Sequence, residues 1–277
     1  MKMKIKQGEM IITTTIRIEA SSDSQSSTGT GFFYSISEHD KYIPMIITNR
    51  HVVQGMKKIT IVFTLADQFN NSLNKHIRYS IDNVTSGIVF HPNKDIDLCA
   101  ITLYDIINDI QSRGETIHTY YIDKTILANQ ELLNNLDAFE EIIMVGYPNG
   151  LWDKTNNKPI VRKGITATHP ALNYNGKSEF LIDAACYPGS SGSPIFYLDK
   201  SYKTEVGASH TGFKIFLLGI LYSGPINQLF IKNMETGSIL PYCAEQMINL
   251  GNIIKAENLL GIELEVKKMV PNASMPK

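Results

Sequence analysis

Short apolar runs separated by polar clusters make up most of the chain. The runs are rich in Ile, Val, Thr, Phe and Tyr, and Gly, Asn, Asp or Ser residues stand between most of them. Runs of this kind predict β-strands. They cover residues 10–20, 30–36, 42–48, 59–65, 98–103, 141–148, 180–185, 193–198 and 214–223. Strands this short and frequent favour an antiparallel sandwich or barrel over alternating βαβ units, so we expect an all-β fold.

Helical patterns are few. Residues 104–113 (YDIINDIQSR) and 128–141 (ANQELLNNLDAFEE) predict helices between strands. Residues 252–261 (NIIKAENLLG) predict a last strand that passes into a short helix. A connector at 112–128 and a frayed tail after residue 265 are weak boundaries. All-β barrels often use a chain of this length as one folding unit, so two separate domains are not required.

The overall composition is that of a soluble globular protein, with 43% hydrophobic and 19% charged residues. The 26 Lys and Arg residues nearly balance 27 Asp and Glu residues, which gives a net charge of −1. No basic stripe stands out, so the electrostatic footprint of a nucleic-acid-binding protein is missing. No apolar run reaches the roughly 18 residues of a membrane span, so we expect no membrane association.

Three cysteines, Cys99, Cys186 and Cys243, lie far apart along the chain. No C-x-x-C pair occurs among them, so we expect neither a zinc site nor a redox motif. We interpret all three as free thiols, which indicates a reducing compartment. The N-terminal segment alternates polar and apolar residues and lacks the apolar core of a secretory signal. A cytoplasmic location is therefore expected.

The stretch LIDAACYPGSSGSP, at residues 181–194, is the strongest candidate for chemistry. Three serines lie within four positions, flanked by two glycines and two prolines. This composition also suits an ordinary turn. A serine hydroxyl is a weak nucleophile at neutral pH, and it needs a neighbouring base that is itself oriented by a partner. The interpretation therefore depends on whether the chain supplies both groups.

His51 is the best candidate for the base. It follows PMIITNR and precedes two valines, so it lies where a buried strand ends. A lone histidine in such a place is more often structural than catalytic, and only suitable partners change that balance. Two further histidines, His169 and His210, are ambiguous. The remaining four are in polar or loop-like contexts that favour the surface: His39, His76, His91 and His118.

Two aspartates in KDIDLCAITL compete for the orienting role. A carboxylate that orients a catalytic imidazole must be buried against it. Asp97 opens the apolar run at residues 98–103, whereas Asp95 follows Lys94 and fits a solvated turn. We therefore predict that Asp97 is the orienting carboxylate.

The order of these groups along the chain is histidine, aspartate, serine. The α/β-hydrolases use the order Ser, Asp, His, and subtilisin-type enzymes use Asp, His, Ser. The order found here is that of the chymotrypsin-like double β-barrel. The spacings, 97 − 51 = 46 and 191 − 97 = 94 residues, suit one barrel that carries histidine and aspartate and a second that carries serine.

Several short segments resemble the motifs of chymotrypsin-like serine peptidases. TNRHVV resembles their histidine motif, DLCAI their aspartate motif, and PGSSGSP their serine motif. The form of the serine motif is closest to HtrA-type and other bacterial trypsin-like peptidases. GTGFF, GYPNG and GILYSG resemble strands of the same fold in the same order. The resemblance extends roughly over residues 10–262.

The resemblance implies a chymotrypsin-like double six-stranded antiparallel β-barrel with a few short helices, in a single trypsin-like peptidase domain. The N-terminal barrel would span about 10–115 and the C-terminal barrel about 125–262, with 265–277 as a tail. The implied nucleophile is Ser191, with the N–H groups of Gly189 and Ser191 as the oxyanion hole. The implied reaction is hydrolysis of a polypeptide substrate through an acyl-enzyme, without a metal or organic cofactor.

Departures from the family pattern flank the nucleophile. Ser190 replaces the usual Asp or Asn, and Ser193 replaces the second glycine of the motif. No Ile-Val-type activation site precedes the first strand, so we expect no zymogen switch. HtrA proteins carry a PDZ domain, for which this sequence leaves no room, so peptide sensing of that kind is not expected. A regulatory protein partner, in a bacterial stress or defence pathway by analogy of fold alone, is then a candidate source of restraint.

The resemblance also places a substrate pocket. Its floor would be Ala185, followed by Cys186, and its opposite wall would be Tyr222, Ser223 and Gly224. Such a lining offers no charge, and an unpaired buried cation would cost several kcal/mol. We therefore expect a preference for an uncharged, small or medium apolar side chain before the scissile bond.

Three other functions compete with a serine peptidase. A catalytically silent relative could bind peptides or partner proteins in the same cleft, although the complete set of serine, histidine and aspartate argues against it. A cysteine enzyme could use Cys186, but a packing role fits that position better. An esterase of the α/β-hydrolase type conflicts with the chain order and with the lack of βα alternation.

Overall fold

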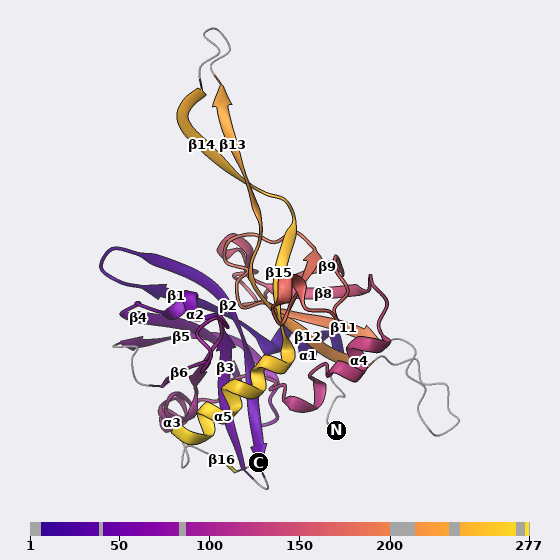
Figure 1. Cartoon of the computed structure of the whole chain (residues 1–277). Helices are drawn as coiled ribbons and strands as arrows, with labels where there is room; N and C mark the ends of the chain where they lie inside the picture. The colour runs from indigo at the N-terminus through magenta and orange to yellow at the C-terminus, as the bar shows by residue number, and fades with distance from the viewer. Residues whose placement is uncertain are drawn as a thin grey trace.

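The computed structural model describes residues 7–38, 41–82, 87–199, 214–232, 239–269 and 275–276. Strands dominate it, and the helices are short (Figure 1). The strands are β1 (Thr15–Ser21), β2 (Ser26–Glu38), β3 (Lys41–Thr48), β4 (Lys58–Ala66), β5 (Ser72–Asp82), β6 (Ile88–Phe90), β7 (Cys99–Thr102), β8 (Glu141–Gly146), β9 (Ile160–Thr166), β10 (Glu179–Asp183), β11 (Pro194–Asp199), β12 (Lys214–Ser223), β13 (Ile226–Lys232), β14 (Ile239–Met247), β15 (Leu250–Lys255) and β16 (Met275–Pro276). The all-β class predicted from the sequence is confirmed.

Helices fill the connections between the strands. The α-helices are α1 (Gln7–Thr14), α2 (Arg50–Val53), α3 (Tyr104–Ser112), α4 (Gln130–Asn135) and α5 (Leu259–Met269). Short 3-10 turns are η1 (Lys124–Ile126), η2 (Pro148–Gly150), η3 (Tyr174–Gly176) and η4 (Ala256–Asn258). Within the described residues, no helix is both long enough and apolar enough to span a membrane.

Some element boundaries differ from those expected. The strand expected at residues 10–20 begins only at Thr15, because α1 occupies the preceding residues. The helix expected at 128–141 is confined to α4, since Asn129 caps its start by accepting a hydrogen bond from Leu132 N–H and Leu136 is already extended. Helix α5 continues through Met269, into the range expected as a tail.

The N-terminal half forms an antiparallel sheet in the order β5-β4-β1-β2-β3-β7-β6, and β16 pairs with β3. Strand β4 buries seven of its nine residues, and three of them, Ile59, Ile61 and Phe63, belong to the core of this half together with side chains of β1 and α3. Strand β5 at the edge exposes much of its length and packs against β4 through residues such as Ile77 and Tyr79. The sheet therefore encloses one apolar core on its own.

The C-terminal half is a closed antiparallel barrel in the order β10-β15-β12-β11-β8-β9. Its strands surround a separate cluster that includes Phe180, Ile182, Ile195 and Ile253, each fully buried. The six-strand count expected for each barrel applies to this half. Together with the N-terminal sheet it confirms the chymotrypsin-like double-barrel class predicted from the sequence.

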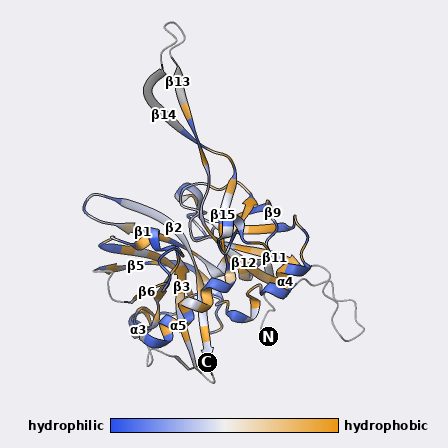
Figure 2. Cartoon of the chain, viewed as in Figure 1, coloured by the Kyte–Doolittle hydropathy of each residue, from blue (hydrophilic) through white to orange (hydrophobic). Residues whose placement is uncertain are grey.

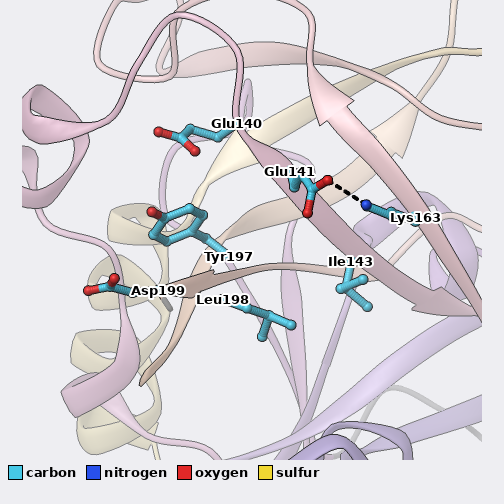
Figure 3. A pocket seen from close by; sticks show the side chains of 7 residues that line it. All are labelled: Glu140, Glu141, Ile143, Lys163, Tyr197, Leu198 and Asp199. Atoms are coloured by element: carbon cyan, nitrogen blue, oxygen red, sulfur yellow. Dashed lines mark hydrogen bonds and ion pairs between the residues drawn. The ribbon is translucent and has the colours of Figure 1, made fainter. Parts of the chain in front are cut away.

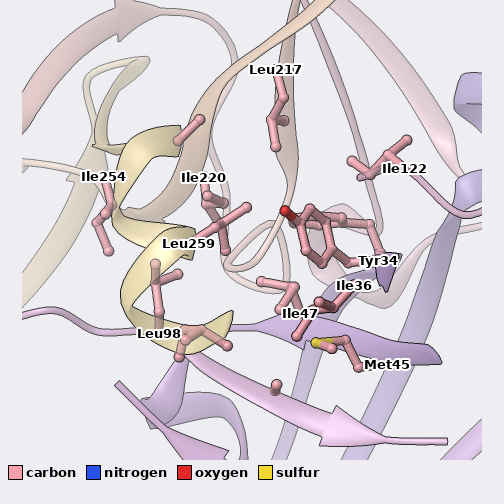
Figure 4. Close-up of a cluster of buried hydrophobic side chains, with 14 of the residues drawn as sticks. Tyr34, Ile36, Met45, Ile47, Leu98, Ile122, Leu217, Ile220, Ile254 and Leu259 are labelled. Carbon is pink, nitrogen blue, oxygen red and sulfur yellow. The ribbon is translucent and has the colours of Figure 1, made fainter. Parts of the chain in front are cut away.

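A third apolar cluster joins the two halves. It combines Tyr34 and Ile47 of the N-terminal sheet with Leu217 and Ile254 of the barrel and with Leu259 of α5 (Figure 4). Figure 2 shows the apolar residues gathered in the strands of the body, with polar residues on the exposed helices and loops. Because the two halves bury a common core, they hold a fixed relation, which any site between them requires.

The buried hydroxyl of Tyr34 ties α5 to this shared core. It donates a hydrogen bond of 2.5 Å to Glu263 Oε1, and both side chains are buried. Burial and the neighbouring carboxylate raise the pKa of Tyr34, so the phenol stays protonated and remains the donor. Helix α5, which crosses the front of the molecule in Figure 1, is thus fastened to β2.

Strands β13 and β14 form a two-stranded ribbon that projects far from the body (Figure 1). The ribbon leaves the barrel just after β12 and returns directly into β15. Two of its apolar side chains near the base, Ile226 and Leu229, are exposed. The ribbon is inserted between β12 and β15, two neighbouring strands of the barrel. The base of the ribbon therefore lies beside the end of β12.

Candidate active site

His51 is presented by the short helix that follows β3. Strand β3 ends at Thr48, Asn49 is fully buried, and α2 starts at Arg50. The next two residues of the helix, Val52 and Val53, are buried and anchor it in the N-terminal core. The His51 ring itself is about half exposed. A buried strand and two buried valines therefore aim an accessible imidazole out of the core.

Asp97 lies directly before β7, the strand that pairs with β3. The backbone around it is held from the histidine side. Asn49 Nδ2 donates a hydrogen bond of 2.8 Å to the Asp97 carbonyl, and Arg50 donates to the carbonyls of His91 (2.7 Å) and Lys94 (3.2 Å). Asn49 and Arg50 thus fix the loop that carries the carboxylate. Their roles are visible only in the folded chain.

His51 and Asp97 form a two-point contact. The ring Nδ1 of His51 lies 2.5 Å from Asp97 Oδ2, and the backbone N–H of His51 donates to Oδ1 at 3.0 Å. Both carboxylate oxygens therefore accept hydrogen bonds from His51. The imidazole is held at Nδ1, and its Nε2 remains available to accept a proton. Asp95, the competing residue, is exposed, and its backbone N–H bonds to the side chain of Asn93.

Ser191 lies in a pair of tight turns between β10 and β11. Ser190 N–H donates to Tyr187 O at 3.0 Å, and Ser193 N–H donates to Ser190 O at 3.0 Å. The third residues of these turns are glycines with positive φ, Gly189 (φ 84°) and Gly192 (φ 89°). These are the features of type II turns, which favour glycine at that position. The nucleophile predicted from the sequence therefore stands on a sharply folded loop.

The Ser191 hydroxyl points toward β12. Its Oγ lies 3.4 Å from the carbonyl oxygen of Tyr222, to which it donates. In the part of the chain that the structure describes, no hydrogen bond links this hydroxyl to the His51 ring. The histidine and the aspartate are thus brought together directly, while the serine rests against the neighbouring strand.

Two backbone N–H groups of the nucleophile loop remain open. Within the described residues, neither Gly189 N–H nor Ser191 N–H donates to a protein acceptor, whereas the intervening Ser190 N–H does. The carbonyl of Pro188 accepts a hydrogen bond of 2.6 Å from Asn149 N–H. Because the N–H and C=O of a trans peptide point in opposite directions, this bond turns Gly189 N–H away from Asn149. Two open donors on one short loop are what an oxyanion hole requires.

Ser193, which replaces the second glycine of the family motif, has a matching space. Its side chain is fully buried and lies where a Cβ at Gly146 would clash with it. Gly146 is the last residue of β8 and belongs to the segment GYPNG. The glycine missing from the serine motif is thus balanced by a glycine on the neighbouring strand.

Ser190 takes the position usually held by Asp or Asn. Its hydroxyl is buried and has no hydrogen-bond partner in the described part of the molecule. The residue next to the nucleophile therefore gives the loop no polar support through its side chain.

A pocket of about 100 Å³ opens beside Ser191. Three residues predicted for it, Cys186, Ser223 and Gly224, line its wall, whereas Ala185 and Tyr222 are not in the lining. Strand β12 has a bulge at Tyr222, which turns this side chain toward Glu179, and the Tyr222 hydroxyl donates to Glu179 Oε2 at 3.0 Å. Burial and that carboxylate raise the pKa of Tyr222 to about 12, so it stays neutral.

Sequence reasoning missed part of this pocket. Leu221 and Met247 also line it, together with Tyr187 and Pro188. Met247 is the last residue of β14 and reaches the pocket because the projecting ribbon returns to the barrel there. The order of strands in the double barrel could have suggested Leu221, but nothing in the sequence marked Met247.

The two cysteines whose side chains the structure describes are not arranged for chemistry. Cys99 and Cys186 are buried free thiols, and burial raises the pKa of Cys186 to about 12 and that of Cys99 as well. The side chain of Cys243 lies outside the described part. Among the described residues, no group of three or more His, Cys, Asp or Glu side chains could hold a metal ion.

A larger cavity, of about 540 Å³, lies elsewhere on the C-terminal barrel. Figure 3 shows its lining from β8, β9 and β11, with an ion pair between Glu141 and Lys163. None of the predicted catalytic or pocket residues belongs to this lining. We therefore place the candidate site at the small pocket beside Ser191.

A comparison with models of protein families gives the family of this chain. Residues 29–201 match the model of the trypsin-like peptidase domain. The chain belongs to the trypsin-like peptidase family. The matched segment contains His51, Asp97 and Ser191, and the family acts on polypeptides. The expectation of a chymotrypsin-like (trypsin-like) peptidase is confirmed at the level of the family.

Solved structures resemble this trypsin-like peptidase at low sequence identity. The serine endoprotease from Yersinia pestis is 14% identical, with 96% of this chain and 68% of that one covered and a TM-score of 0.47. The thermostable serine protease AL20 from an extremophilic microorganism is 11% identical (92% and 97% covered, TM-score 0.48). A mutant of the tobacco etch virus protease is 12% identical (100% and 87% covered, TM-score 0.48). No curated protein matches the chain.

Proposed function

We propose that this trypsin-like peptidase is a serine endopeptidase that uses Ser191, His51 and Asp97 as its triad. The observation that carries the proposal is the two-point contact between His51 and Asp97, with Nδ1 at 2.5 Å from the carboxylate. This contact selects the tautomer in which Nε2 can accept a proton. It lies in the same described domain as a serine on a tight turn beside a pocket.

The proposed reaction is acyl transfer to water. Ser191 Oγ attacks a peptide carbonyl while His51 Nε2 takes its proton, and Asp97 stabilises the imidazolium that forms. The developing oxyanion accepts hydrogen bonds from Gly189 N–H and Ser191 N–H, which have no other acceptor within the described residues. The leaving amine takes the proton from His51, and water repeats the sequence on the acyl-enzyme. The proposed mechanism uses no cofactor.

The pocket supports a preference for an uncharged apolar side chain before the scissile bond. Its volume of about 100 Å³ and its lining by Leu221, Met247 and Cys186 suit a small or medium group. None of the lining residues carries a charge, so a buried Lys or Arg side chain would lie unpaired.

A second candidate function is a peptidase-fold protein whose cleavage activity is silent or is switched on by a partner. It is favoured by one observation, the hydrogen bond from Ser191 Oγ to the Tyr222 carbonyl at 3.4 Å in place of one to His51. Catalytic hydrogen bonds are often long or poorly aligned before substrate binds, so the same geometry is compatible with an active enzyme. We propose the cytoplasm as the location, supported by two buried thiols that are not joined in a disulfide.

Reaction with a fluorophosphonate probe tests the two functions. The active serine peptidase should be labelled on Ser191 without any added partner, and Ser191→Ala should remove the label. Ser190→Ala is the matched control, because it removes a buried hydroxyl that makes no hydrogen bond one residue away. Labelling that survives Ser191→Ala would refute the assignment, and labelling that needs an added protein would favour the second function.

A further inference from the structure

Thr30 of β2 lies at the contact between the two halves of the molecule. It is fully buried, and it belongs to the segment GTGFF of the N-terminal sheet. A Cβ at Gly192, one residue after the nucleophile, would clash with the Thr30 carbonyl. This threonine therefore packs directly against the loop that carries Ser191, although the two are far apart in the sequence.

Each polar group of Thr30 is used to hold another segment. Its N–H donates to the Ser191 carbonyl at 2.8 Å, and its hydroxyl donates to the Gly189 carbonyl at 3.0 Å. The same hydroxyl accepts from Tyr147 N–H at 3.0 Å. The Thr30 carbonyl accepts from the hydroxyl of Thr48 at 2.7 Å. One side chain thus links β2, the end of β8 and the nucleophile loop.

The two bonds from Thr30 lie on either side of the open N–H of Ser191, and both follow the open N–H of Gly189 along the chain. Its hydroxyl holds the carbonyl of Gly189 and its N–H holds the carbonyl of Ser191, the two residues whose own N–H groups have no acceptor within the described residues. The Thr30 hydroxyl also accepts a hydrogen bond from Tyr147 N–H. Two residues further along that segment, Asn149 N–H donates to the Pro188 carbonyl at 2.6 Å. The peptide planes 188–189, 189–190 and 191–192 are therefore fixed from outside the loop, whereas the plane 190–191 is held by Ser193 N–H, which donates to the Ser190 carbonyl.

Within the loop, two backbone hydrogen bonds close the turns, but the side chain next to the nucleophile adds no further bond. The Ser190 side chain, which lies between the two open donors, has a buried hydroxyl without a partner in the described part of the chain. A glycine-rich loop has many accessible conformations, and ordering it requires bonds from its surroundings. In this chain Thr30 supplies two of those bonds directly and a third through Tyr147 and Asn149.

We propose that Thr30 is a positioning residue that sets the oxyanion hole, through a hydroxyl that donates to Gly189 O and accepts from Tyr147 N–H. The proposal rests on the proposed function, since it names what holds the donors of that same site in place. A hydroxyl is needed because a single atom must donate and accept at once. Valine has the same shape and can do neither.

Thr30→Val tests the proposal through the rate of fluorophosphonate labelling across pH. Misplaced oxyanion donors should lower the rate at its plateau by roughly 10- to 100-fold. The midpoint of the rate-against-pH curve should not move, because the His51–Asp97 contact is untouched. Thr30→Ser keeps the hydroxyl and should restore the rate to within about 3-fold of the wild type. Thr60→Val is the control, because it removes the bond between Thr60 Oγ1 and Ser80 Oγ in the same sheet.

Amide hydrogen exchange provides a second readout that does not need activity. Thr30→Val should speed exchange at the protected amides of residues 190, 192 and 193, with other strands unchanged, and Thr60→Val should not. The proposal is wrong if Thr30→Val matches the wild type in labelling rate and in amide exchange. It is also wrong if Thr60→Val loses as much labelling rate and amide protection as Thr30→Val. An unlabelled wild type would refute the proposed function alone, and exchange at these amides would still decide the role of Thr30.

Discussion

The two sides of the candidate site are held by different parts of the molecule. His51 and Asp97 lie at the ends of β3 and β7, which pair in one sheet, and hydrogen bonds within the N-terminal half fix both residues. The Ser191 loop belongs to the C-terminal barrel, which bonds it through Leu221 and Asn149, but the Gly189 and Ser191 carbonyls are held by Thr30 of the other half. The proton-transfer pair is thus a property of one sheet, whereas the nucleophile loop depends on how the two halves meet.

The largest effect should come from removing either reacting side chain. Ser191→Ala and His51→Ala should each lower kcat by roughly 10⁶-fold, because the triad works as a unit. The measurement is cleavage of a protein substrate found by mapping new termini in a proteome digest. Ser190→Ala should retain activity. A loss of similar size from Ser190→Ala would contradict the assignment of Ser191 as the nucleophile.

Asp97→Asn should lower kcat by roughly 10⁴-fold while leaving the fold intact. An amide at this position would favour the wrong imidazole tautomer. Asp95→Asn is the matched control, since Asp95 is exposed and lies two residues away. Steady-state kinetics of both variants decide the matter. Equal activity of Asp97→Asn and the wild type would mean that the 2.5 Å contact has no catalytic role.

Gly189→Ala should lower kcat by about 10²- to 10³-fold, the cost of losing an oxyanion donor. Gly189 has φ 84°, and an added Cβ would lie 2.7 Å from the Tyr147 carbonyl, so the loop must move. Gly176→Ala is a control for backbone strain alone, because Gly176 has φ 78° with open space around it. If both variants lose activity to the same extent, the cause would be backbone strain at a positive φ and not the placement of the Gly189 N–H.

Gly146→Ala should destabilise the protein by about 1–3 kcal/mol, since the new Cβ would overlap the Ser193 side chain. Adding Ser193→Gly removes the main obstacle and should restore part of the loss. The rescue should be incomplete because Thr30 Oγ1 would still lie 2.9 Å from the added Cβ. Urea denaturation of the single and double variants measures the coupling, and strictly additive losses would rule out the packing that we describe.

The smallest effect concerns Cys186 at alkaline pH. Burial raises its pKa to about 12 in the folded chain, above the roughly 8.5 of a free thiol. Its contribution to stability is therefore complete below pH of about 8.5 and is lost as pH rises toward the folded value. At pH of about 9.5 the wild type should lose about 1 kcal/mol relative to Cys186→Ala, compared with pH 7. Urea denaturation at the two pH values tests this, and rapid alkylation of native Cys186 at pH of about 8 would contradict it.

The sequence by itself determined the class of fold and the candidate chemistry. Short apolar runs with turn residues between them are a local signal, and most of them became the strands of the two halves. The helix at residues 104–113 was also predicted from its own pattern and appears as α3. The order and spacing of His51, Asp97 and Ser191 carried the interpretation, because a shared chain order restricts which fold can bring such groups together.

The tertiary structure decided what holds the site. Thr30, Tyr147 and Gly189 are brought together across more than a hundred residues, and Met247 reaches the pocket only through the return of a projecting ribbon. The balance between Ser193 and Gly146 likewise exists only where two strands pack. Periodicity and propensity describe neighbours along the chain, whereas these contacts depend on which faces the folded halves press together, and no local pattern encodes that choice.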